Sequence, residues 1–474
     1  MRPSAGSLEI ARRDWLKAAS LTGASALAGV DRLAAESNPT PATKVRGVVF
    51  MVSDGMSPGV MTLAEAYSKL TRKQGTCWWQ LFNNKSSVRG LMDNASANSL
   101  VTDSAAASSA WGGGKRVNNG AINMTPDGKA VTPVAQILKK NPSMRIGLVT
   151  SATVTHATPA GFAASVSKRS DENLISPQYL NRVDVILGGG SGFFDKNARP
   201  DQLDLNGEFA KAGYDVVADR QAMLNSKNPK LLGTFTTGHL PFSLDRDHNP
   251  AMQAQIPTLQ EMATAALARF IESDGPFLLQ IEGARIDHAA HLNDIAGLLG
   301  EQLAFDDAVA AVLAMTAGRK DILVVVTSDH GNANPGLNGM GVSYAESSQR
   351  FERITRMKAS FERVFAEWGG IRKCDPKKLT DLVQRHLDFK LKGGEAEALC
   401  DIFAKEPIVE WNHQLDKPEG LLGQIAGNHT GIGWTGTTHT SDPTLVSAIG
   451  PQQDRFSGMV TNSDVFGHFV EMLG

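Results

Sequence analysis

One serine and a set of acidic and histidine residues have the side chains that could do chemistry in this chain. The serine is Ser104, directly after Asp103 in the stretch Val101–Trp111. A serine hydroxyl is a poor nucleophile at neutral pH unless a base or a metal ion removes its proton. The chain has no nearby Ser/His/Asp order but many Asp and His pairs, which favours the metal route. These pairs end apolar runs in Ser53-Asp54-Gly55, Ile281-Glu282-Gly283, Asp287–His291 and Ser328-Asp329-His330, and Thr438-His439-Thr440 adds one more imidazole.

Two groups of these residues have the spacing of zinc ligands. Asp287 and His291 are four residues apart, so a helix would place both side chains on one face. With the distant His439 they would form a three-ligand zinc site that leaves one position open. Asp329 and His330 are adjacent. They could therefore reach one ion together only at an irregular strand end.

A third group would consist of oxygen ligands alone. Asp54 follows an apolar run and is free to bridge two ions. Together with Glu282 and a hydroxyl such as that of Thr158, it would form a set that suits magnesium.

Ser104 would stand at the start of a helix, because Ala105–Trp111 is strongly helix-prone. Free N–H groups and the helix dipole favour an anion there, either an alkoxide or a bound phosphate. A plain helix cap remains the alternative role for Ser104. Ser108 and Ser109 lie inside the predicted helix and are weaker candidates.

The elements that must position these residues are buried strands alternating with helices. Amphipathic runs at Pro257–Glu272 and Asp294–Met315 predict two of the helices. This alternation predicts an α/β fold with a largely parallel central sheet and helices on both faces. Asp54, Glu282 and Asp329 then fall at the C-terminal ends of strands, where such sheets place their sites. The predicted strands are Val48–Val52, Ile146–Thr150, Val183–Leu187, Phe277–Ile281, Ile322–Thr327 and Leu445–Ile449.

Composition excludes several classes of protein. The chain has 474 residues and a net charge of -2, so nothing global indicates nucleic acid or a membrane surface as a partner. Its three cysteines form neither a disulfide framework nor a zinc ribbon. Cys374 and Cys400 are the only pair close enough in sequence to suggest a bridge.

The first 35 residues are interpreted as a twin-arginine export signal. Arg12-Arg13-Asp14-Trp15-Leu16-Lys17 precedes a weakly apolar run, Ala18–Val30, that is too short to span a membrane. Cleavage could follow Ala26-Leu27-Ala28 or Leu33-Ala34-Ala35, and a disordered basic tail is the alternative. The signal predicts a periplasmic or secreted protein that engages the twin-arginine export machinery and has no membrane span in its mature part.

Residues 36–474 then form one catalytic domain, interrupted at about 340–430 by a helical insertion. Within it, Ser347–Lys392 predicts two helices broken near Gly369-Gly370, with twelve Lys or Arg against six Asp or Glu. The insertion is interpreted either as a lid near the mouth of the site or as a solvated surface.

Taken together, the motifs resemble those of the alkaline phosphatase family. They occur in the family's order and span residues 46 to 451, with the signal and the insertion lying outside the resemblance. The matching segments are Met51–Met56, Asp103-Ser104-Ala105, His156–Ala160, Glu282–His291, Thr327–His330 and His439-Thr440.

The resemblance implies a phosphomonoesterase with two zinc ions and one magnesium ion that works through a phosphoserine. It implies Ser104 as the attacking residue and Arg169 as the clamp for the phosphate of small monoesters, although the adjacent Lys168 could take that place. By the same analogy the chain would form a homodimer. The implied ligands are Asp287, His291 and His439 for one zinc, Asp54, Asp329 and His330 for the other, and Asp54, Thr158 and Glu282 for magnesium.

Two positions vary within the family. His156 and His288 stand where some bacterial members have Asp and Lys, and where animal members have His. Either ring could bind the third metal or could only orient its ligands through hydrogen bonds.

Rival functions have weaker support in the sequence. The Cys- or Ser-x-Pro-x-Arg motif of sulfatases is absent. A phosphodiesterase with the same metal layout and an inactive exported metal- or phosphate-binding protein remain alternatives. The run Gly188–Gly192 resembles a phosphate loop but lacks its full spacing, so a plain turn is the better interpretation.

Overall fold

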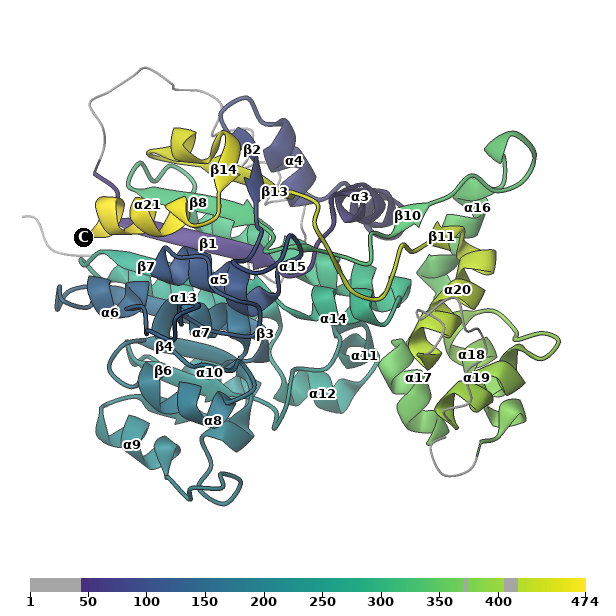
Figure 1. Cartoon of the computed structure of the whole chain (residues 1–474), viewed down its shortest axis with the longest axis horizontal. Coiled ribbons are helices and arrows are strands. Elements are labelled where there is room, and N and C mark those ends of the chain that lie inside the picture. The colour runs from purple at the N-terminus through teal and green to yellow at the C-terminus, as the bar shows by residue number, and fades with distance from the viewer. Residues whose placement is uncertain (1–43, 370–373, 405–416) are drawn as a thin grey trace, which may run out of the picture.

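A sheet of ten strands forms the centre of the computed structural model, which describes residues 44–369, 374–404 and 417–474 (Figure 1). The strand order is β14-β2-β13-β8-β1-β7-β3-β4-β6-β5. Neighbouring strands are parallel except where β13 pairs with β2 and with β8. The strands are β1 (Gly47–Ser53), β2 (Val88–Asp93), β3 (Arg145–Thr153), β4 (Val185–Gly189), β5 (Asp215–Val217), β6 (Leu231–Thr234), β7 (Phe277–Gly283), β8 (Ile322–Thr327), β13 (Thr444–Ile449) and β14 (Gly458–Thr461).

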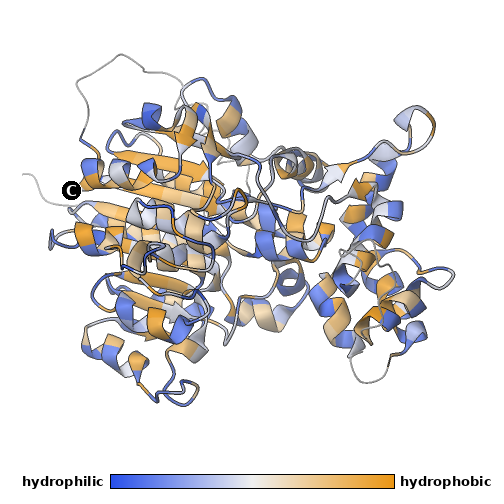
Figure 2. Ribbon diagram, in the orientation of Figure 1, coloured by the Kyte–Doolittle hydropathy of each residue, from blue (hydrophilic) through white to orange (hydrophobic). Residues whose placement is uncertain are grey.

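Side chains of the central strands enter two separate hydrophobic cores. Val49 and Met51 of β1 belong to one core, whereas Val48, Phe50 and Val52 belong to the other. This alternation follows from the pleat, which points successive side chains to opposite faces. Figure 2 shows the strands as a hydrophobic layer, as expected for a parallel sheet covered on both sides.

Helices cover each face of the sheet and complete one core each. The first core contains residues of α3 (Pro58–Arg72), α4 (Cys77–Asn83), α13 (Leu259–Glu272) and α15 (Ile295–Thr316). The second contains residues of α5 (Ser104–Gly113), α6 (Val134–Leu138), α7 (Ala157–Ala163) and α21 (Asp464–Leu473). The fold class predicted from the sequence is therefore confirmed. The remaining helices of the sheet region are α8 (Glu172–Ile175), α9 (Leu205–Lys211), α10 (Arg220–Asn225), α11 (Ser243–Asp247), α12 (Pro250–Gln255) and α14 (Arg285–His291).

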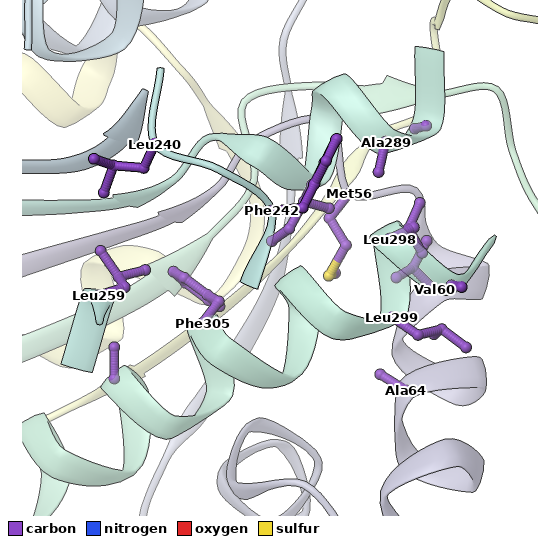
Figure 3. Packing of buried hydrophobic residues seen from close by; sticks show 14 of the residues in the cluster. Met56, Val60, Ala64, Leu240, Phe242, Leu259, Ala289, Leu298, Leu299 and Phe305 are labelled. Carbon is purple, nitrogen blue, oxygen red and sulfur yellow. The ribbon is translucent and has the colours of Figure 1, made fainter. Parts of the chain in front are cut away.

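Beneath the C-terminal ends of the strands, the first core is packed tightly. Figure 3 shows Leu298 and Leu299 of α15 beside Val60 of α3, and Met56 next to Phe242. Met56 lies two residues after Asp54, so this packing fixes the loop that follows β1.

The chain leaves the sheet region after β8 and returns to it at β13. Between them lies a group of helices beside the sheet (Figure 1). They are α16 (Ser347–Glu352), α17 (Phe361–Trp368), α18 (Pro376–Leu387), α19 (Glu395–Phe403) and α20 (Pro418–Thr430). Two short ladders join the outgoing and returning chain: β9 (Gly331–Asn332) with β12 (His439–Thr440), and β10 (Gly336–Leu337) with β11 (Ile432–Gly433).

The helical segment differs in detail from its sequence prediction. The described part of Ser347–Lys392 contains three α-helices instead of two, because α16 ends at Glu352 and α17 begins only at Phe361. The predicted break at Gly369 is confirmed, since α17 ends at Trp368 and Gly369 has a φ of 69°. Cys374 and Cys400 form the expected disulfide and link α18 to α19.

The interpretation of residues 1–35 as an export signal lies outside the described residues. In the part of the chain that is described, no helix combines the length and the apolar character needed to cross a membrane.

Candidate metal centre

The ends of three adjacent strands bring the predicted acids together. β1 lies between β7 and β8, and Val52 of β1 is level with Glu282 of β7 and Thr327 of β8. Asp54 and Asp329 follow two of these strands by one and two residues, so both lie at the same edge of the sheet as Glu282. All three carboxyl groups are fully buried. The placement expected from the sequence is therefore correct.

Ser104 begins helix α5, but it does not cap it. The cap is Asp103, whose Oδ1 accepts a hydrogen bond of 2.9 Å from the N–H of Ala106. The hydroxyl of Ser104 is left to face the centre, 3.2 Å from Nε2 of His330. The alternative that Ser104 only caps the helix is therefore wrong.

The first ligand group consists of Asp287, His291 and His439. The Nε2 atoms of the two rings are 3.0 Å apart, and they lie 3.3 Å and 3.5 Å from the carboxylate of Asp287. Each Nδ1 donates to a backbone oxygen, from His291 to Thr437 at 2.7 Å and from His439 to Thr102 at 2.9 Å. Both protons are thus committed to carbonyls, and both Nε2 lone pairs are directed at one point, as in metal-bound imidazoles.

The second group consists of Asp54, Asp329 and His330. The N–H groups of Gly55 and His330 both donate to Oδ1 of Asp329, each at 3.0 Å. The other oxygen, Oδ2, has no hydrogen-bond donor and lies 3.1 Å from Nε2 of His330. Ser104 contacts this same nitrogen, so the candidate nucleophile adjoins the second group.

The third group combines Asp54 and Glu282 with His156. Thr150 donates a hydrogen bond of 2.5 Å to Oε2 of Glu282, whereas Oε1 has no hydrogen-bond partner. The hydroxyl of Thr158 and Nδ1 of His156 are also buried without a partner. Thr158 lies in the first turn of α7, directly after Ala157, and His156 is the N-cap of the same helix, which keeps both close to the predicted oxygen set.

The electrostatics of the centre favour bound cations. Both oxygens of Asp54 are buried and lack hydrogen-bond partners. Burial, together with the charges of Asp329, Asp287 and Glu282, raises the pKa of Asp54 well above its ordinary value. Burial also raises the pKa of Glu282 to about 7. Burying several carboxylate charges close together costs free energy unless bound metal ions balance those charges. These acids therefore have the character of metal ligands.

Arg169 lies beside Asp103, the residue that precedes Ser104. Its guanidinium donates to Oδ2 of Asp103 at 3.1 Å and contacts Nε2 of His156 at 2.9 Å. Lys168, the other candidate for this role, is exposed. Asp103 thus binds the start of the α5 helix through one oxygen and Arg169 through the other.

His156 and His288 have different surroundings. His156 belongs to the third ligand group, whereas no group found among the described residues includes His288. Nδ1 of His288 lies 2.8 Å from Nη1 of Arg285, and its ring centroid is 4.6 Å from that of His239.

Four residues near the centre were missed by sequence reasoning: Thr150, His239, Arg285 and Asn332. Asn332 donates to Oδ1 of Asp287 at 2.7 Å, and Arg285 forms an ion pair with Glu362. A polar residue inside an apolar strand was the available signal for Thr150. His239 had no signal, because it lies in a loop that only the fold brings to the centre.

The other motifs take no part in the ligand groups. The run Gly188–Gly192 is not the plain turn that the sequence favoured: Gly188 and Gly189 end β4, and Ser191 begins a short 3-10 helix. Between them, the N–H of Gly190 donates to the backbone oxygens of Thr236 and Gly238 at 2.9 Å. Ser108 and Ser109 use their hydroxyls inside the α5–α7 packing, where each donates to Ala105.

Comparison with known proteins agrees with this geometry. The family model for alkaline phosphatase matches residues 45–474. Alkaline phosphatase 4 of Bacillus subtilis is 30% identical over 443 residues, which cover 89% of this chain and 87% of that protein. The repressible alkaline phosphatase of Saccharomyces cerevisiae is 31% identical over 454 residues, which cover 88% of this chain and 78% of that protein.

Solved structures give the same result. The crystal structure of Thermus thermophilus alkaline phosphatase has a TM-score of 0.85 and 32% identity, covering 93% of this chain and 94% of that one. A cold-active alkaline phosphatase from Shewanella sp. has a TM-score of 0.73 and 26% identity, covering 90% and 100%. The chain therefore belongs to the alkaline phosphatase family and is a phosphoric monoester hydrolase.

Proposed function

We propose that this enzyme hydrolyses small phosphate monoesters through a phosphoserine on Ser104, with two zinc ions and one magnesium ion in its centre. The mixed nitrogen and oxygen donors of the first two groups suit zinc. The third group is rich in oxygen, and the unpaired hydroxyl of Thr158 extends it, which suits magnesium.

The residues that would hold each ion follow from these groups. Asp287, His291 and His439 would hold one zinc, and Asp329 and His330 would hold the other together with Asp54. Asp54 would also serve magnesium, with Thr158 and Glu282. His156 would approach the magnesium through its unpaired Nδ1, whereas His288 would orient neighbouring side chains through Arg285.

When bound, the ions would lower the proton affinity of the reacting oxygens and stabilise the charge that develops on phosphate. Arg169 would hold two phosphate oxygens with its planar guanidinium. The Oγ atom of Ser104 would then attack phosphorus, forming the Oγ–P bond while the P–O bond to the alcohol breaks. The departing alkoxide would take up one proton, which balances the proton lost by the Ser104 hydroxyl, and leave as the alcohol. Water would next attack the phosphoserine, releasing inorganic phosphate and returning the hydroxyl of Ser104.

One observation carries this proposal. The hydroxyl of Ser104 is buried at a helix start, is not used as the cap, and lies 3.2 Å from a histidine of the second ligand group. A serine placed in this way is suited to activation by metal ions.

The test is to detect the covalent intermediate. Enzyme mixed with excess aryl phosphate and quenched in acid should carry one phosphoryl group on the peptide that contains Ser104. Ser104→Ala should keep its metals and fold but lose turnover by several powers of ten. Ser108→Ala is the matched control, because this serine lies one turn later in α5 and outside every ligand group. Normal burst kinetics in Ser104→Ala would exclude the assignment.

A second assay separates the rival activities. Phosphate release from an aryl monoester, but not from the matching diester, and its loss after chelation would agree with the proposal. Preference for the diester would indicate a phosphodiesterase. Tight phosphate binding without any turnover would indicate an inactive binding protein.

We also propose that residues 1–35 are a twin-arginine signal and that residues 36–474 act as one catalytic domain in the periplasm or outside the cell. The segment 340–430 would be a helical insertion in that domain. The Cys374–Cys400 disulfide supports an oxidising compartment. Replacing both Arg12 and Arg13 by lysine should leave the enzyme unprocessed in the cytoplasmic fraction, whereas unchanged export would contradict the route.

A further inference from the structure

A cavity of about 420 Å³ lies next to the first ligand group. His291, a member of that group, lines it, as does the following residue, Leu292. The opposite wall comes from the helical segment and contains Glu362, Phe365 and Glu419. A larger cavity of about 650 Å³ lies wholly among residues 346–429 and touches none of the ligand groups. Only the smaller cavity therefore adjoins the proposed chemistry.

The cavity lies on the side of the centre where the alcohol part of the substrate would leave. Ser104 contacts His330 of the second group, so the attacking oxygen belongs on that side of the centre. In an in-line displacement supported by two ions, the leaving oxygen belongs at the other ion. That is the group of Asp287, His291 and His439, which the cavity adjoins.

Helix α17, which supplies Glu362 and Phe365, is anchored to the sheet region. The N–H of Phe361 donates to Oδ2 of Asp294 at 2.7 Å, and the N–H of Ser360 donates to Oδ1 of Asp245 at 2.9 Å. Both pairs are buried. The cavity wall is therefore fixed relative to the ligand groups, as a site that selects its ligand requires.

Aromatic packing also fixes the ring of Phe365. Its centroid lies 5.2 Å from that of Phe403 and 6.3 Å from that of Trp368. With Leu292, this ring offers an apolar surface to whatever occupies the cavity.

Of the two acids that line the cavity, Glu362 is paired with a cation and Glu419, among the described residues, is not. Arg285 forms an ion pair with Glu362 and lies 3.8 Å from the ring centroid of Phe242, so its charge is engaged. The N–H of Thr153 donates to Nδ1 of His239 at 3.1 Å, so this nitrogen carries no proton and the ring is neutral. In the described part of the chain, no ion pair or hydrogen bond is formed by the carboxylate of Glu419. Lys417, two residues before Glu419, is exposed and does not line the cavity, although its charge acts on His291, which does.

We propose that this cavity is the leaving-group subsite, and that it selects monoesters whose alcohol places a ring against Phe365 and Leu292 and has no negative charge of its own. The proposal rests on the proposed function, because it locates the departing alcohol relative to Ser104. A second carboxylate or phosphate on the substrate would meet Glu419 and find no unpaired cation among the described lining residues.

The test compares four substrates in the metal-loaded enzyme: methyl phosphate, phenyl phosphate, 4-carboxyphenyl phosphate and 4-(aminomethyl)phenyl phosphate. Phe365→Ala should lower kcat/KM for phenyl phosphate by about tenfold and change that for methyl phosphate little, because only the former has a ring to bury. Glu419→Gln should raise the ratio of kcat/KM for the carboxyphenyl to the aminomethylphenyl ester by about three- to tenfold, an effect that added salt weakens. Glu397→Gln, an exposed acid of α19, is the matched control and should leave the ratio unchanged.

Inhibition by inorganic phosphate separates this proposal from the proposed function. Phosphate has no leaving group, so its inhibition constant should be the same in both variants and the wild type. Unchanged substrate ratios in active variants, or a parallel shift in the inhibition constant, would overturn the subsite. Absence of phosphoserine in the wild type would instead overturn the proposed function.

Discussion

Asp54 is the residue on which the centre depends most. Among the described residues it is the one acid shared by two ligand groups. Neither of its oxygens has a hydrogen-bond donor, although the loop around it is buried. A carboxylate in this position can hold each of two ions with one oxygen. Its place directly after β1 explains why it can serve both, because the neighbouring strands β7 and β8 carry the other acids.

Replacing Asp54 should therefore affect more than one metal. Asp54→Ala should lower both the zinc and the magnesium content measured by mass spectrometry of desalted protein. Asp329→Ala is the matched control, because Asp329 belongs to one group only. Loss of a single ion from the Asp54 variant, with the others intact, would show that Asp54 is not a bridge.

Arg169 should bind phosphate without taking part in bond breaking. Arg169→Ala should weaken inorganic phosphate and substrate by about 1–3 kcal/mol, the range for hydrogen bonds to charged groups. The measurement is the inhibition constant of phosphate together with KM. Lys168→Ala should leave both unchanged, since Lys168 is exposed. The opposite pattern would move the role to Lys168.

The sequence was sufficient to predict which acids and histidines the fold brings together, but not the residues that orient them. Asp54, Asp329 and His330 stand at the ends of apolar runs, so type and position together revealed them. Asn332 and Asp103 act through hydrogen bonds that exist only once the loops are folded. The role of Ser104 could not be decided in advance, because a hydroxyl and its neighbouring carboxylate are both good caps.

At the level of elements, the strands buried on both faces were the ones that could be predicted. β1, β7 and β8 are continuous apolar runs, whereas the exposure of successive residues alternates in β2. Such half-exposed or very short strands, including the three residues of β5, do not stand out from loops. The predicted start of β4 was two residues early, at Val183 instead of Val185.

The disulfide between α18 and α19 should stabilise the helical segment. It closes a loop across 26 residues. By restricting the conformational entropy of the unfolded chain, such a loop adds about 3 kcal/mol to the free energy of unfolding. The double variant Cys374→Ser/Cys400→Ser should lose protection from hydrogen exchange in α18 and α19 while keeping activity on methyl phosphate. A reducing agent should produce the same loss in the wild type and none in the variant. An equal effect of the reducing agent on the variant would contradict this explanation.

At the level of the whole molecule, metal ions should matter most for stability at high pH. Burial raises the pKa of Glu282 from 4.5 to about 7, and burial with neighbouring acids raises that of Asp54. A carboxyl group with a raised pKa in the fold stabilises it fully below the unfolded pKa, and this stability is lost as pH rises through the folded pKa. The contribution of these two acids to the stability of the chelated protein should thus fall between pH 4.5 and about 7.

The measurement is Tm with and without metals at pH 5.5 and pH 8. The difference between the two forms should be larger at pH 8, because the bound ions compensate the ionised acids. Glu282→Gln removes one titrating group, so the chelated variant should lose less stability over this range. If the difference in Tm between the metal-loaded and the chelated protein were the same at both pH values, the raised pKa values of Glu282 and Asp54 would be contradicted.

The order of strands in the sheet also constrains how the chain can be synthesised. β2 is made early, yet its two neighbours, β13 and β14, follow every other strand of the sheet in the chain. Until these two strands emerge, β2 has unpaired N–H and C=O groups along both sides, which is the kind of surface that joins nascent chains to one another. His439 emerges shortly before β13. A ribosome that stops short of it releases a chain with neither a paired β2 nor a complete first ligand group, so the sheet and the metal centre become complete over the same short part of synthesis.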